Sequence, residues 1–143
     1  MGTLAYFAPE LLTGRLIEQN DFSLKRTDIT LEEWMKTDLW AFGAVIVELL
    51  ICQPLIKYVA ITKNGAPKNL DQLPEDEYDG YLNAALWDIR GFGIEPKTIE
   101  EIVATRNRRA IANQQQSLSA PYQQELIELL TNLLQRDPKK RHF

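Results

Sequence analysis

Side chains that could take part in chemistry are concentrated in three short blocks of this 143-residue chain. The blocks are GTLAYFAPE at residues 2–10, DLWAFG at 38–43 and LQRDPKKR at 134–141. They carry hydroxyls, carboxylates and a guanidinium, which are groups that hydrogen-bond and form ion pairs. The only cysteine, Cys52, and the only histidine, His142, predict neither a metal cluster nor a Cys–His nucleophilic pair.

The three blocks resemble, in the same order, three blocks of eukaryotic-type serine/threonine protein kinase domains. Residues 2–10 resemble the GTxxYxAPE block that closes the activation segment. Residues 38–43 resemble the DxWSxG start of the family's central buried helix, with Ala41 in place of the usual serine. Residues 134–141 are similar to the LLxxDPxxR block near the family's C-terminus. The resemblance therefore extends over nearly the whole chain, with divergent residues between the blocks.

The resemblance implies structural roles for five residues. In the family, the APE glutamate forms a buried ion pair with the late arginine, so Glu10 is expected to pair with Arg141. Asp38 corresponds to an aspartate that hydrogen-bonds the backbone of the catalytic loop, although its position also suits a plain helix N-cap. Trp40 and Gly43 correspond to core positions, where the indole fills space and the glycine permits close approach of another element.

Two further residues are implied to face the substrate groove of such a kinase, Thr3 and Tyr6. Thr3 corresponds to the threonine that contacts the catalytic aspartate beside the target hydroxyl. The intact Gly-Thr-x-x-Tyr form favours serine or threonine as the phosphate acceptor. In the complete parent protein, the implied reaction is therefore transfer of the ATP γ-phosphate to serine or threonine.

The residues that perform phosphoryl transfer in this family are not found in the chain. They belong to a Gly-rich loop, a strand lysine, an HRD-x-x-x-x-N loop and a DFG aspartate, all of which precede APE. The strings VAITK at 59–63 and RGFG at 90–93 resemble two of these motifs only by chance, because their order is wrong. We therefore assign no catalytic, cofactor-binding or metal-binding residue here. The chain alone is expected to be inactive, and ATP and magnesium are implied only for a complete parent kinase.

Composition indicates an ordinary intracellular globular chain. A net charge of −4 and a pI near 5.1 give no sign of nucleic-acid binding. The longest apolar run, residues 39–51, is shorter than the roughly 20 residues that a bilayer requires, so no membrane partner is expected. A single cysteine fits a reducing compartment, which favours the cytoplasm.

The predicted fold is mainly α, a single partial domain over residues 1–143 built around a central buried helix. We expect a loop over 13–29, a short helix from Thr30 to about Lys36, and a second helix from Thr37 or Asp38 to about Cys52, apolar on every face. Residues 55–73 are expected to form a long connection. Further helices are predicted at 74–90, ending at Gly91, at 98–112 behind a capping box, and from Ser119 onward.

Two functions remain open from the sequence. The first is a piece of a serine/threonine kinase large lobe, whose partners are a protein substrate and the missing N-terminal half. In that case the peptide-docking helix could be either the 75–90 or the 98–112 segment. The alternative is a noncatalytic, pseudokinase-like interaction module that folds alone, with the acidic stretch 71–79 as one candidate contact surface.

Overall fold

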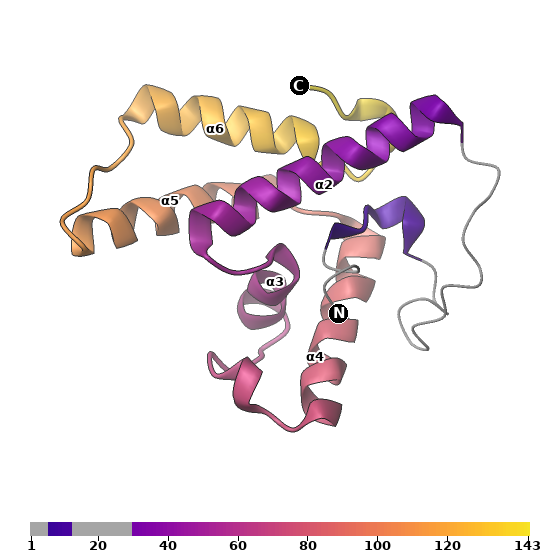
Figure 1. The fold of residues 1–143 in the computed structure, drawn as a ribbon, viewed down its shortest axis with the longest axis horizontal. Helices are drawn as coiled ribbons and strands as arrows, with labels where there is room; N and C mark the ends of the chain where they lie inside the picture. Colours follow the sequence, from indigo (N-terminus) through magenta and orange to yellow (C-terminus); the bar gives the residue numbers. More distant parts are fainter. Residues whose placement is uncertain (1–5, 13–29) are drawn as a thin grey trace.

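The computed structural model describes residues 6–12 and 30–143, and this part of the chain is mainly helical, as predicted, and contains no strand. Figure 1 shows a long central helix, α2, with the other helices arranged around it. The elements in chain order are η2 (Pro9–Leu11), α2 (Leu31–Ile51), α3 (Leu55–Lys63), η4 (Leu70–Gln72), α4 (Glu75–Phe92), α5 (Pro96–Ala112), α6 (Ala120–Leu133) and η5 (Pro138–Lys140).

Helix α2 is continuous, which corrects the prediction of two helices meeting at Thr37 or Asp38. The capping part of that prediction is confirmed, because Thr30 Oγ1 accepts a hydrogen bond from the Glu33 backbone N–H at 3.2 Å. No glycine or proline interrupts the chain between residues 31 and 42, so nothing forces the helix to stop there. It ends at Cys52, which adopts a left-handed conformation with φ of 58°.

The predicted connection at residues 55–73 is wrong in its first half, where α3 forms. Pro54 adopts an extended conformation before this helix, and its carbonyl accepts from the Tyr58 N–H at 3.1 Å. Asn64 and Gly65, which the sequence suggested as turn residues, lie directly after α3, so the turn occupies only part of the segment. Burial stabilises this short helix, because five of its nine residues are buried: Leu55, Ile56, Tyr58, Val59 and Ala60.

The later helices lie close to their predicted positions, with corrected ends. Helix α4 continues past Gly91 to Phe92 and is ended by Gly93, whose φ is +68°. Helix α5 begins at Pro96, so the capping box expected at Thr98 does not form, and Thr98 is instead buried in the first turn. Helix α6 begins after Ser119 as predicted, with Pro121 in its first turn.

The core lies around the buried face of α2, which contacts α3, α5, α6 and η5, while α3 packs on α4. In Figure 1, α2 crosses the molecule with α6 and α5 on one side and α3 and α4 below. In the described part of the chain, no single helix is long and apolar enough to cross a membrane. Only α2 and α3 taken together pass that test of length and composition, as a pair bent by 69°.

Candidate functional site

The best-defined polar site is the fully buried guanidinium of Arg141, which joins two blocks 131 positions apart. Its Nη1 donates to Glu10 Oε2 at 2.7 Å, and its Nη2 lies 2.7 Å from Glu10 Oε1. The guanidinium carbon also lies 5.2 Å from the centre of the Trp40 ring. A planar guanidinium is suited to this arrangement, because it can grip both carboxylate oxygens and still stack on an aromatic face.

The other donors of Arg141 bond to backbone carbonyls. Nε donates to Gln135 O at 2.7 Å, Nη1 to Lys36 O at 3.1 Å and Nη2 to Arg136 O at 3.2 Å. In return, Lys36 Nζ donates to the Arg141 carbonyl at 2.7 Å. Each of the three guanidinium nitrogens therefore donates at least one hydrogen bond, and the contact of Nη2 with Glu10 Oε1 adds an ion pair without hydrogen-bond geometry.

Short turns on each side aim the two partners at each other. Glu10 lies in η2, which begins at Pro9 after the extended residue Ala8. On the other side, Asp137 Oδ1 accepts from the Lys139 backbone N–H at 3.0 Å and caps η5, with Pro138 as its first residue. The Asp-Pro sequence thus fixes the turn that directs Arg141 inward.

Tyr6 forms a second link between the first block and α2. Its hydroxyl donates a hydrogen bond to Glu48 Oε2. The bond to this carboxylate, together with burial, raises the pKa of the Tyr6 phenol above its usual value. Glu48 is not among the site residues predicted from the sequence. The available signal was that Glu48 is the only charged residue within the apolar run 39–51.

One of the predicted site residues that the structure describes, Asp38, lies apart from this cluster. Asp38 is exposed in the interior of α2 and makes no hydrogen bond or ion pair with the residues that the structure describes. Its alternative role as a helix N-cap is therefore wrong, because the helix begins seven residues earlier, at Leu31. Thr3 lies outside the described residues.

Trp40 and Gly43 both lie in the core, against the third block or the helix before it. Trp40 is 1% exposed and stacks on Arg141. A Cβ added to Gly43 would lie 2.9 Å from Leu134 Cδ2 and 3.1 Å from Leu133 Cβ. Glycine at this position is therefore needed because the end of α6 approaches the α2 backbone too closely for a side chain.

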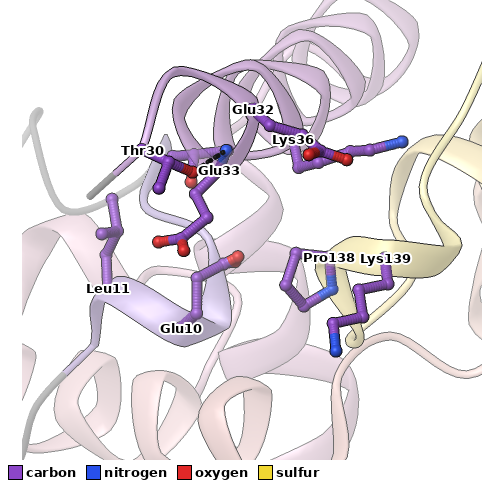
Figure 2. Close-up of a pocket in the computed structure, with 9 residues that line it drawn as sticks. Glu10, Leu11, Thr30, Glu32, Glu33, Lys36, Pro138 and Lys139 are labelled. Carbon is purple, nitrogen blue, oxygen red and sulfur yellow. Dashed lines mark hydrogen bonds between the residues drawn. The ribbon is translucent and has the colours of Figure 1, made fainter.

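A pocket of about 500 Å³ lies beside the Glu10–Arg141 pair, between the start of α2, η2 and η5. Figure 2 shows Glu33 and Glu10 on one side and Pro138 and Lys139 across from them. Its lining residues are Glu10, Leu11, Thr30, Glu32, Glu33, Lys36, Thr37, Pro138 and Lys139. The described residues contain no group of three or more histidine, cysteine, aspartate or glutamate side chains that could hold a metal ion. The interaction at this site is ion pairing, which holds η2, α2 and η5 together.

Comparison of the chain with protein-family models, with curated proteins and with solved structures finds no match. The resemblance to protein kinases is therefore one of three short sequence blocks.

Proposed function

We propose that this chain forms the structural part of the large lobe of a eukaryotic-type serine/threonine protein kinase. The observation that carries the proposal is the buried ion pair between Glu10 and Arg141. These residues occupy the glutamate and arginine positions of the first and third blocks, which the resemblance expects to pair. Two unrelated surface charges would stay hydrated and mobile, and such exposed pairs contribute little to stability, unlike a buried pair.

A second observation supports a lobe that continues beyond the described residues. One face of α2 carries large apolar side chains at helical spacing that remain exposed, namely Leu31, Met35, Phe42, Val45 and Leu49, between 41% and 79% exposed. Covering each of these with a neighbouring element would contribute about 1.5–3 kcal/mol. Asp38 lies on the same face, without a partner among the described residues. In the proposed lobe, this face packs against the catalytic-loop region, and Asp38 hydrogen-bonds that loop.

The parent protein would transfer the γ-phosphate of ATP to serine or threonine. Groups that bind ATP and magnesium would come from kinase segments that this sequence does not contain. Tyr6, held to α2 through Glu48, and Thr3 would form part of the wall that faces the substrate. The contribution of this chain is thus positioning and stability, and none of its residues is assigned to the chemical step.

The alternative is a noncatalytic interaction module. It is favoured by the continuity of the apolar core, whose buried residues come from Ala8 and Leu12 on either side of η2 and from all five α-helices of the described chain. A core shared by all these elements is what an independently folding unit requires.

The upstream reading frame and a substitution at Asp38 together separate the two functions. If the kinase proposal holds, the reading frame upstream of Met1 should encode HRD-x-x-x-x-N and DFG, and the complete protein should transfer phosphate from labelled ATP to serine or threonine peptides. In that protein, Asp38→Asn should lower kcat, whereas in residues 1–143 alone it should leave the melting temperature unchanged. Glu32→Gln is the matched control, an exposed carboxylate of the same helix, and should leave both properties unchanged. An upstream region without an open frame would contradict the kinase proposal and favour the module.

A further inference from the structure

A second pocket, of about 580 Å³, is lined by two arginines that the proposed function does not use. They are Arg90, in the last turn of α4, and Arg136, between α6 and η5. The remaining lining residues are Pro9, Glu10, Leu12, Gly91, Asp137 and Pro138. This pocket is distinct from the one in Figure 2, although Glu10 and Pro138 belong to both.

Each arginine is held in place through its Nε atom. Arg90 Nε donates to the Leu12 carbonyl at 2.8 Å, and Arg136 Nε donates to the Arg90 carbonyl at 3.1 Å. Arg90 also lies over Trp87, with its guanidinium carbon 5.2 Å from the ring centre. These contacts restrain the Nε end of each guanidinium, although both residues are exposed, which lowers the entropy that binding would cost.

The backbone also fixes the position of Arg136. Gly93 has a φ of +68°, and a Cβ added there would lie 2.8 Å from Arg136 Cβ. Arg136 therefore packs directly on the glycine that ends α4. The two arginines come from segments far apart in sequence, and Arg136 is joined to the end of α4 by this contact and by its bond to the Arg90 backbone carbonyl.

The terminal nitrogens of both arginines donate to no acceptor within residues 6–12 and 30–143. Glu10 is already paired with Arg141, so Asp137 is the remaining carboxylate in the lining of the pocket. Two guanidiniums against one such carboxylate leave an excess of positive charge in a chain whose net charge is −4. Guanidinium groups with free terminal nitrogens are the preferred partners of phosphate and carboxylate oxygens.

We propose that this pocket binds the oxyanion group of an acidic peptide, either the phosphate of a phosphorylated residue or a side-chain carboxylate. Its volume accommodates a peptide side chain with its neighbours, and Pro9 and Pro138 supply apolar walls beside the charged centre. Two arginines suit a single oxyanion, whereas a nucleic-acid backbone needs a row of cations. The proposal stands whether the chain belongs to a kinase or to a noncatalytic module, because it depends only on the pocket.

The direct test uses three labelled five-residue alanine peptides with phosphoserine, glutamate or serine at the centre. Fluorescence anisotropy with residues 1–143 should show that at least one acidic peptide binds about tenfold more tightly than the serine peptide. Comparison of the phosphoserine and glutamate peptides identifies the source of the oxyanion. Raising the salt concentration should weaken binding of the preferred acidic peptide and leave binding of the serine peptide unchanged. Equal binding of all three peptides would overturn the proposal.

Variants separate ligand binding from a purely structural role of the arginines. Arg90→Gln and Arg136→Gln should each abolish the preference for the acidic peptide, whereas Lys140→Gln, an exposed neighbour outside the pocket lining, should keep it. Asp137→Asn is the decisive variant, because asparagine can still cap η5 while one repelling carboxylate is removed. It should tighten binding of the acidic peptide several-fold, a gain that a misfolded protein cannot give. Unchanged or weaker binding in Asp137→Asn would count against an oxyanion site.

Discussion

The two faces of α2 differ little in composition and strongly in environment. On one face Trp40, Val47 and Ile51 are at most 1% exposed and pack against the other helices. On the other, Phe42 and Leu49 are 47% and 77% exposed. Apolar sequence alone therefore does not determine which face is covered. The buried face also carries Gly43, where the absence of a side chain lets the end of α6 approach the α2 backbone.

The first and third sequence blocks are joined on the buried face of α2. Arg141 stacks on Trp40, a residue of the buried face, and pairs with Glu10, so the ion pair lies on the side of α2 that the core covers. In the described part of the chain, no comparable ion pair joins the exposed face of α2 to another element. Substitutions on the buried face should therefore cost more stability than substitutions on the exposed face.

The largest effect is expected from Arg141→Ala. It leaves the Glu10 carboxylate, whose side chain is 18% exposed, without its counter-charge, and it removes the hydrogen bonds to the backbone carbonyls of Gln135, Lys36 and Arg136. Breaking such a buried pair costs about 3–5 kcal/mol. Urea denaturation should show this loss relative to Lys140→Ala, which changes an exposed side chain next to it and should cost less than about 0.5 kcal/mol. Equal stabilities of the two variants would mean that the pair does not stabilise the fold.

The two faces of α2 can be compared directly with a matched pair of valines. Val47 is 0% exposed and Val45 is 41% exposed, two positions apart on one helix. Val47→Ala should lower the free energy of unfolding by about 2 kcal/mol, because it removes buried methyl groups and leaves a cavity. Val45→Ala should change it by less than about 0.5 kcal/mol, since alanine also favours the helix. A similar loss at both positions in residues 1–143 would show that the exposed face is covered in solution.

Gly43 gives a third comparison, with Gly80 as its control. Both lie inside helices, but a Cβ at Gly43 would meet Leu133 and Leu134, whereas one at Gly80 would meet nothing within 4 Å. Gly43→Ala should therefore destabilise the protein by about 1–2 kcal/mol, the cost of overpacking minus the gain in helix propensity. Gly80→Ala should stabilise it by up to about 1 kcal/mol. Thermal unfolding of both variants measures the difference, and a stabilising Gly43→Ala would contradict the close approach of α6.

Much of the helical architecture could be predicted, because its signals are local. Neighbouring residues alone are enough to predict three features: the Thr30 cap, the start of α6 after Ser119, and the apolar periodicity of α4. Helix α3 was missed since nine residues are too few for periodicity to distinguish a helix from a connection, and its stability comes from burial against α4.

The site shows the same limit. The partners Glu10 and Arg141 were expected only because a family resemblance joins them across 131 positions. No local pattern predicts that Glu48 accepts a bond from Tyr6 or that Arg136 lies against Arg90, because both contacts depend on how the helices pack. Long-range polar contacts of this kind are fixed by tertiary structure and not by spacing in the sequence.

The smallest effect is expected at Tyr6, on the edge of the covered side of α2. Because the bond to Glu48 raises the phenol pKa in the folded state, the folded protein favours the protonated form. The stabilisation is thus fully present below the unfolded pKa of about 10 and is lost as the pH rises through the higher folded pKa. Tyr6→Phe should cost less than about 1 kcal/mol at pH 8, since the bond is only partly buried, and this cost should shrink above pH 10. Urea unfolding of the wild type, Tyr6→Phe and the exposed control Tyr122→Phe between pH 8 and 11 measures the difference, and a pH-independent cost at Tyr6 would mean that its hydroxyl does not bond the Glu48 carboxylate.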